Sequence, residues 1–122
     1  MNPISPIDAM IELLKGGRFD YADEKICQIQ IESYFNHCGV TFCREYQLEN
    51  GIPDFFFPRS GLVLEIKASK QWSKMQVYRQ CENYCKSSEV TGLVLATGKA
   101  QGLPPEINGK PVRIYNLGIG LL

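Results

Sequence analysis

The stretch at residues 51–68 constrains the fold of this chain most strongly. Two apolar runs flank the turn sequence Pro-Arg-Ser-Gly at 58–61, and this arrangement predicts a β-hairpin. Charged side chains are almost never fully buried unless they are paired or hold a metal. These runs nevertheless contain Asp54, Glu65 and Lys67. We therefore expect the hairpin to carry a functional site as well as part of the core.

The spacing of the three charges predicts their geometry. If Arg59 and Ser60 form a two-residue loop, Asp54 lies opposite Glu65 on the neighbouring strand, with Cβ atoms about 5 Å apart. Two carboxylates at that separation repel each other, and a divalent cation between them removes the repulsion because hard cations prefer oxygen ligands. Alternation along the strand places Glu65 and Lys67 on one face. The hairpin thus predicts a metal-binding acid pair with an ammonium group beside it.

The charge of the chain is balanced overall but unevenly placed. The 122 residues suit one domain, and the formal net charge of zero argues against a generally basic nucleic-acid binder. Residues 61–122, however, hold eight Lys and Arg against four Asp and Glu. Lys70, Lys74 and Arg79 follow the hairpin and are candidates for binding backbone phosphates. A solvated helix face explains the same pattern equally well.

The sequence also favours a compartment. It has no apolar run of the roughly 20 residues that span a bilayer, and its first residues lack the pattern of a secretory signal. Five cysteines form no C-x-x-C pair, which is typical of a reducing environment. We expect a cytoplasmic protein with no membrane partner. Four cysteines are predicted to pack on apolar helix faces, where a free thiol acts as a small hydrophobe: Cys27, Cys38, Cys81 and Cys85.

Two helices are predicted before the hairpin. A short one spans 4–15, with Ser5 as its N-cap, and a longer one spans 22–38. The core stripe expected for the longer helix is Cys27, Ile31, Tyr34, Phe35 and Cys38. Glu24 extends this stripe at the helix start, and Gln28 follows one turn later. An acid there belongs either to the site or to ordinary helix-dipole chemistry, which favours acids in a first turn.

Further elements complete the predicted order. Strands are expected over 40–48, 91–97 and 112–117, with a loop over 98–105. A helix over 73–86 begins at Ser73, which forms a capping box with Gln76. Gln80 and Tyr84 lie four residues apart and share a face of this helix. Because the second of these strands follows the helix, we expect it to lie parallel to the hairpin strand before it.

These residues carry a resemblance to a known family. Pro53-Asp54 followed by Glu65-Ile66-Lys67 matches the two-part signature of the PD-(D/E)XK nuclease superfamily. The order of helix, three strands, helix and strand over residues 22–97 is similar to its common core. Gly51-Ile-Pro-Asp resembles the opening of the VRR-NUC branch and of archaeal Holliday-junction resolvases. The resemblance implies a restriction-endonuclease-like α-β-β-β-α-β core, an α/β fold whose mixed sheet is flanked by helices.

Two flanking features strengthen the resemblance. Glu24 lies near the start of the helix before the sheet, where many members place another acid, and Gln80-x-x-x-Tyr84 resembles a motif of several branches. The chain would then be a single nuclease-like domain over 1–122. It divides into an N-terminal helical extension at 1–20, the core at 22–97, and a C-terminal loop and strand at 98–122.

The resemblance also implies a mechanism. The implied metal ligands are Asp54, Glu65, Glu24 and the main-chain carbonyl of Ile66, and the implied ion is Mg²⁺ or Mn²⁺. Lys67 would orient the attacking water and stabilise the transition state. Gln80 would contact the water, the phosphate or Lys67. No small-molecule cofactor is expected.

The implied partner is DNA with a branched, flapped or junction structure. The residues expected to contact nucleic acid are Lys70, Lys74, Arg79 and Tyr84. A second copy of the chain is a candidate partner, since symmetric cutting of two strands needs a two-fold dimer.

Three alternatives stay open from the sequence. One is a catalytically inactive, nucleic-acid-binding member of the same fold. Another is a structural module in which Glu65 and Lys67 form a buried ion pair, which leaves Asp54 unexplained. The third is a metal-cluster nuclease that uses the cysteines.

Overall fold

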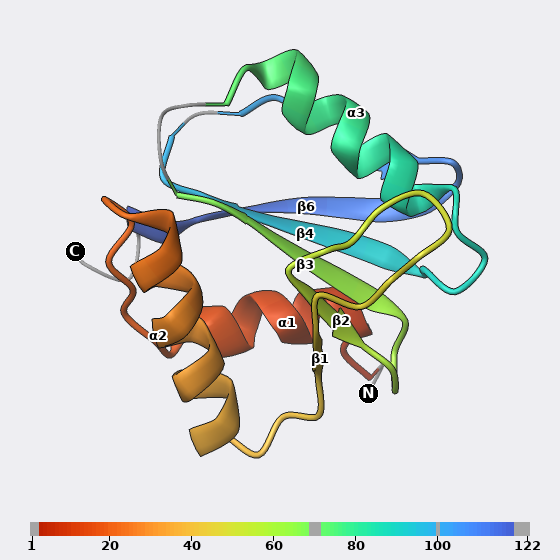
Figure 1. Ribbon diagram of the computed structural model, residues 1–122. Coiled ribbons are helices and arrows are strands. Elements are labelled where there is room, and N and C mark those ends of the chain that lie inside the picture. Colours follow the sequence, from red (N-terminus) through yellow and green to blue (C-terminus); the bar gives the residue numbers. More distant parts are fainter. Residues whose placement is uncertain (1–2, 69–71, 100, 119–122) are drawn as a thin grey trace.

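A six-stranded mixed sheet separates the helices into two layers (Figure 1). This computed structural model describes residues 3–68, 72–99 and 101–118. Its helices are α1 (Pro6–Lys15), α2 (Glu24–His37) and α3 (Lys74–Cys85). Its strands are β1 (Cys43–Arg44), β2 (Phe55–Phe57), β3 (Leu62–Lys67), β4 (Gly92–Thr97), β5 (Glu106–Ile107) and β6 (Lys110–Asn116), in the spatial order β1-β2-β3-β4-β6-β5. The predicted α/β class with a mixed sheet is confirmed.

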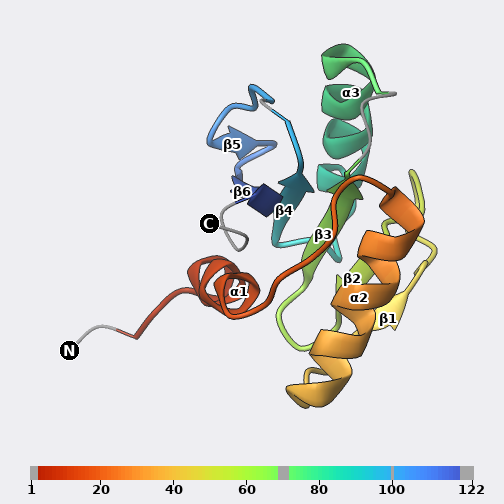
Figure 2. The same cartoon turned by 90° about the vertical axis from the view of Figure 1, so that its left-hand side faces the viewer.

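The helices cover both faces of the sheet. Helices α1 and α2 lie on one face and α3 on the other (Figures 1 and 2). Each interface has its own core cluster: Phe35, Phe55 and Leu64 belong to the first, and Val63 and Leu95 to the second. Strands β3 and β4 are buried on both sides, which explains their nearly continuous apolar sequences. Among the described residues, no helix combines the length and apolar character needed to cross a bilayer.

The helix starts follow the predicted capping chemistry. The Ser5 hydroxyl caps α1, and Ser73 forms the predicted capping box with Gln76 at α3. Helix α2 ends at His37, before Gly39 with its φ of +74°. The predicted burial of Cys38 is wrong, because that residue follows the last helical turn and is exposed. The other three helix cysteines are buried as predicted: Cys27, Cys81 and Cys85.

The first strand is much shorter than predicted. Of the expected run at 40–48, only Cys43–Arg44 pairs with β2. Glu45 has a φ of +52°, which ends the extended conformation. Alternation along a strand over 40–48 would place Phe42 and Tyr46 on one face. This expectation is wrong, since Phe42 packs with the α2 layer and Tyr46 with the α3 layer.

The remaining strands agree more closely. Strand β4 runs parallel to β3, as predicted from the helix between them. The last strand begins slightly earlier than expected and pairs with the short β5 across a turn at Asn108 and Gly109. The sequence did not indicate β5, because two residues are too few for a detectable pattern.

The hairpin has the predicted register but a longer turn. Phe57 pairs with Leu62 and Phe55 with Leu64, so continuing the register places Asp54 opposite Glu65. Pairing stops at Phe57, which leaves a four-residue turn in place of the two-residue loop we expected. A hydrogen bond of 2.7 Å from the Gly61 amide to the Phe57 carbonyl closes this turn.

Gly61→Ala is expected to destabilise the protein through two separate effects. The residue has a φ of +81°, and a Cβ there would lie 2.9 Å from the Glu89 carbonyl oxygen. The positive φ alone costs about 1–2 kcal/mol. Gly109→Ala is the matched control, because Gly109 has a φ of +75° and open space around it. Chemical denaturation should show a clearly larger loss for Gly61→Ala, and equal losses would contradict the crowding.

Candidate active site

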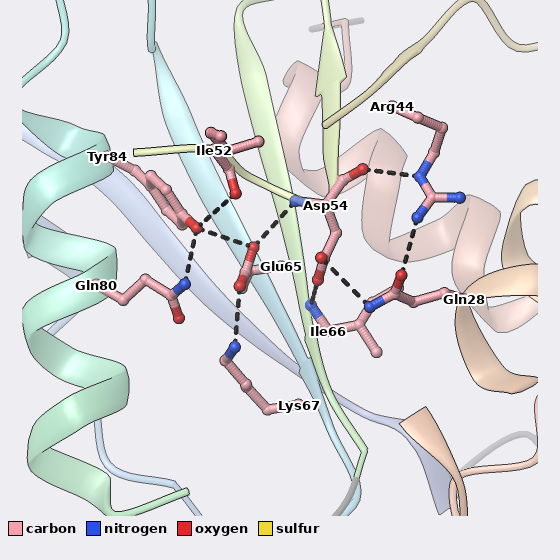
Figure 3. A network of polar contacts seen from close by, with 9 residues as sticks. All are labelled: Gln28, Arg44, Ile52, Asp54, Glu65, Ile66, Lys67, Gln80 and Tyr84. Carbon is pink, nitrogen blue, oxygen red and sulfur yellow. Dashed lines mark hydrogen bonds and ion pairs between the residues drawn. The ribbon is translucent and has the colours of Figure 1, made fainter. Parts of the chain in front are cut away.

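Strand β3 brings two opposite charges into the core on the face covered by α3. Glu65 is 2% exposed and Lys67 is 6% exposed. Their side chains share one face, as predicted, and form an ion pair with Nζ 3.0 Å from Oε2 (Figure 3). Burying two charges costs several kcal/mol per ion before their attraction is counted. Such a cost in a central strand indicates a functional constraint.

Asp54 lies immediately before β2 and is tied to β3 through the main chain. Its Oδ2 accepts a hydrogen bond of 2.8 Å from the Ile66 amide. Its own amide donates to Glu65 Oε1 at 3.1 Å. The two carboxylates are therefore joined by peptide N–H groups, and their further contacts differ: Asp54 contacts Gln28 of α2, and Glu65 contacts Tyr84 of α3 (Figure 3). Ile66 enters the site as a main-chain donor, a role that the sequence did not predict.

Arg44 and Gln28 hold Asp54 from the α2 side. Gln28 Nε2 donates to Asp54 Oδ1 at 3.3 Å, and Arg44 Nε donates to the Asp54 carbonyl at 2.9 Å. Arg44 also donates to Gln28 Oε1 at 2.8 Å, pairs with Glu32, and lies over the Phe55 ring. Arg44 was not among the site residues predicted from the sequence. The available signal was a cation among the apolar residues of the predicted first strand.

Helix α3 supplies a second support, centred on a buried tyrosine hydroxyl. Tyr84 is 1% exposed, and its hydroxyl lies 3.1 Å from the Ile52 carbonyl and 3.3 Å from Glu65 Oε1. Gln80 Nε2 donates to this hydroxyl at 2.9 Å. Gln80 thus reaches the carboxylate through Tyr84. The direct nucleic-acid contact expected of Tyr84 does not fit its burial, because the side chain presents no surface to a ligand.

Tyr84→Phe is expected to destabilise the protein by about 1–3 kcal/mol, the usual cost of leaving a buried acceptor unsatisfied. The substitution keeps the ring but removes the hydroxyl that lies near the Ile52 carbonyl and is one of several partners of Glu65. Tyr78→Phe is the control, because Tyr78 is only half-buried on the same helix, with an expected change within about 0.5 kcal/mol. Urea denaturation measures both, and similar losses would contradict the hydroxyl's role.

Glu24 begins α2, directly after the Asp23 N-cap. Its Oε1 is buried and has no hydrogen-bond partner within the described ranges. Its charge contributes to raising the pKa of both Asp54 and Cys27. A dipole role explains an acid at a helix start, but it does not explain a buried oxygen without a donor. A hard cation would supply the partner that this oxygen lacks among the described residues.

The pKa values of the acid pair, Asp54 and Glu65, also indicate negative charge that lacks a sufficient partner. Burial, followed by the nearby charge of Asp54, raises the pKa of Glu65 to about 7 despite the Lys67 ammonium. Burial also raises the pKa of Asp54, although the Ile66 amide and Lys67 oppose the shift. Both shifts disfavour the ionised form, as expected where burial and neighbouring negative charge outweigh the positive charge available to the acids.

The donor set is suited to a hard divalent cation. Carboxylate oxygens from Glu24, Asp54 and Glu65 are the ligand type that Mg²⁺ and Mn²⁺ prefer. Among residues 3–68, 72–99 and 101–118, no three acidic, histidine or cysteine side chains gather into a ready-made cluster. Asp54 and Glu65 belong to one hydrogen-bonded network, and the charge of Glu24 is close enough to contribute to raising the pKa of Asp54. The unpartnered Glu24 oxygen and the raised pKa values of the two neighbouring acids show that these residues fit such an ion.

The predicted phosphate-binding residues are only partly placed. Lys74 and Arg79 are exposed on α3, the helix that supplies Tyr84 and Gln80. Lys70 lies outside the described residues. The two described cations are thus on the surface of the element that supports Glu65, where a solvated helix face and a phosphate-binding edge would look alike.

Comparison with known proteins gives no family assignment. No family model, curated protein or solved structure matches the chain.

Proposed function

We propose that this chain is a metal-dependent nuclease that hydrolyses phosphodiester bonds in DNA. The observation that carries the proposal is the network joining Asp54 and Glu65 through peptide N–H groups, with Lys67 paired to Glu65. The order α2, β1, β2, β3, α3 and β4 supports a restriction-endonuclease-like core. The proposal includes the PD-(D/E)XK resemblance, with Asp54, Glu65 and Lys67 in the signature positions.

The acids would hold the ion, and the other residues would prepare the site for it. Asp54, Glu65 and Glu24, with the main-chain carbonyl of Ile66, would bind Mg²⁺ or Mn²⁺. When bound, such an ion lowers the pKa of a coordinated water and neutralises charge on the scissile phosphate. Gln28 and Arg44 fix the orientation of Asp54, and Tyr84 fixes that of Glu65. This rigid support is what preorganised ligands require.

Lys67 contributes a positive charge where negative charge develops during hydrolysis. Its ammonium lies in a buried site, where an electrostatic interaction with phosphate oxygens is stronger than in water. It would orient the attacking water or stabilise the transition state on the phosphate. Lys74 and Arg79 would bind backbone phosphates beside the site, a contact that carries no sequence preference.

A purely structural role for the Glu65–Lys67 pair explains less. The ion pair is present, as that alternative requires. It leaves Glu24 Oε1 buried without a partner and leaves the pKa of both neighbouring acids raised. A cation in the site removes all three misfits at once.

A panel of labelled substrates tests the proposal. Single-stranded, duplex, flapped and four-way-junction DNA, with RNA of the same sequences, are incubated with Mg²⁺, Mn²⁺ or EDTA. We expect metal-dependent cleavage of DNA, with a preference for branched substrates. Binding without cleavage under both metals would identify an inactive nucleic-acid-binding member of the fold. The absence of both binding and cleavage would contradict both functions.

The panel also addresses oligomeric state. One site of this kind cuts one strand per encounter, whereas symmetric cutting of a junction requires a two-fold dimer. We expect light scattering to show two chains per junction if paired nicks appear. Paired symmetric nicks from a monomer would contradict this part of the proposal.

A further inference from the structure

The ammonium of Lys67 has a second neighbour besides Glu65. Its Nζ lies 3.9 Å from the ring centroid of Trp72, the single tryptophan of the chain. Trp72 is half-buried and Lys67 is nearly fully buried, so the contact is shielded from water. A cation over an indole face is stabilised most when it is desolvated. Nothing in the mechanism above uses this ring.

Trp72 is placed by the fold independently of Lys67. It directly precedes Ser73, whose capping box fixes the start of α3. Its main-chain carbonyl accepts a hydrogen bond of 3.0 Å from Lys99 Nζ. Trp72 and Val77 occupy the N′ and N4 positions of a hydrophobic staple and both belong to the core layer under α3. The ring is therefore a preorganised platform for the ammonium.

Glu65, the other partner of Lys67, is shared among several groups. Glu65 Oε2 pairs with Lys67, while Oε1 accepts from the Asp54 amide and the Tyr84 hydroxyl. If Glu65 also binds a divalent cation, its attraction for the ammonium weakens, and the added positive charge repels Lys67. The attraction between the indole face and the ammonium is not weakened in this way, because it does not depend on Glu65.

We propose that Trp72 is a positioning residue that keeps the Lys67 ammonium inside the site when Glu65 is engaged by a divalent cation. This inference rests on the proposed function. It gives the ring a role distinct from stacking on a base, since the face toward Lys67 is already occupied. It also explains why a large aromatic residue stands at the entrance to α3, beside the most buried charges of the sheet.

Proton NMR of the lysine side chains tests the contact without measuring cleavage. Protons above an aromatic face resonate upfield, so the Lys67 Hε signals should lie upfield of those of exposed Lys74. Lys67→Met assigns the signals. Trp72→Leu should remove the upfield shift and Trp72→Phe should keep most of it, with amide spectra confirming that each variant is folded. An unshifted Lys67 signal in the wild-type protein would overturn the proposal.

The same measurement with Mg²⁺ separates this inference from the proposed function. We expect the Lys67 shift to persist at saturating Mg²⁺ while the Asp54 and Glu65 resonances move. Loss of the Lys67 shift on adding Mg²⁺ would overturn the positioning role. No response of Asp54 or Glu65 to Mg²⁺ would contradict the proposed function. It would also reduce Trp72 to a structural contact, which overturns the positioning role on different grounds.

Kinetics on the DNA cleaved in the panel give the second readout. Trp72→Leu should lower kcat about tenfold, equivalent to about 1.4 kcal/mol, with KM unchanged. Trp72→Phe should recover most of the rate because it restores an aromatic face. An increase in KM with kcat retained would show that the ring contacts the substrate, which would overturn the proposal.

Discussion

Lys67→Met is expected to lower the rate of DNA cleavage by about a hundredfold or more, the usual effect of removing one preorganised group that stabilises charge in a transition state. Methionine keeps the apolar stem of the side chain in its buried position. The variant should remain folded, because the pKa of Glu65 of about 7 lets this carboxyl take up a proton when its partner is removed. Single-turnover cleavage with saturating Mg²⁺ measures the effect.

Lys74→Met is the matched control for this experiment. Lys74 carries the same charge on the first turn of α3, but it is exposed, whereas Lys67 is buried. Its loss should weaken DNA binding slightly and reduce the salt dependence of binding, with the rate of the bound complex unchanged. A Lys67→Met protein that is folded, binds DNA and cuts at the wild-type rate would contradict the role of Lys67.

The metal-free protein is expected to lose stability as the pH rises from 5 to 8. The pKa of Glu65 is raised in the fold from its ordinary value of 4.5 to about 7. A group with a raised folded pKa contributes stability that is fully present below its unfolded pKa and is lost as the pH rises through the folded pKa. The free energy of unfolding in EDTA should therefore fall by up to about 3 kcal/mol. Asp54, whose pKa is also raised, acts in the same direction.

Mg²⁺ should reverse this loss. A ligand that binds only the folded protein stabilises it in proportion to the logarithm of its concentration over the dissociation constant. The acids bind a cation only when ionised, so Mg²⁺ should raise the melting temperature at pH 8 and change it little at pH 5. Thermal melts at both pH values with EDTA or Mg²⁺ check this expectation.

Two variants identify the group responsible for the pH dependence of stability. Glu65→Gln removes the titrating group and should flatten the pH dependence between 5 and 8. Glu49→Gln changes an exposed acid in the loop before the hairpin and should leave that dependence intact. A pH slope that survives Glu65→Gln would assign the effect elsewhere. A stability independent of Mg²⁺ at pH 8 would argue against the cation site.

The hairpin was largely predictable because its information is local. Turn residues at 58–61 and the alternation of charges along β3 set both the register and the shared face of Glu65 and Lys67. The caps at Ser5 and Ser73 were predictable for the same reason, since each acts within one helical turn. The turn itself was longer than expected, because Pro58 and Gly61 do not join the strand pairing.

The supports of the site were less predictable because they join distant segments. Arg44 reaches Asp54 only because a short β1 pairs with β2, and the positive φ of Glu45 ends that strand early. Tyr84 reaches Glu65 because α3 packs across the sheet. Motif spacing placed Tyr84 on the correct helix face but could not show that its hydroxyl is buried. The exposure of Cys38 was missed because a stripe pattern does not reveal where a helix ends.

The sequence by itself determined which charges the core must accommodate: Asp54, Glu65 and Lys67 stand in runs too apolar to remain on the surface. The alternation of side chains along the strands and the residues of the turn set their register, because both effects act between neighbours in the chain. Only the tertiary structure decided what surrounds them. The unpartnered Glu24 oxygen, the Arg44 and Tyr84 supports and the Trp72 ring over Lys67 arise from packing between distant elements. Burial and charge at such contacts depend on every layer of the fold, and no local pattern encodes them.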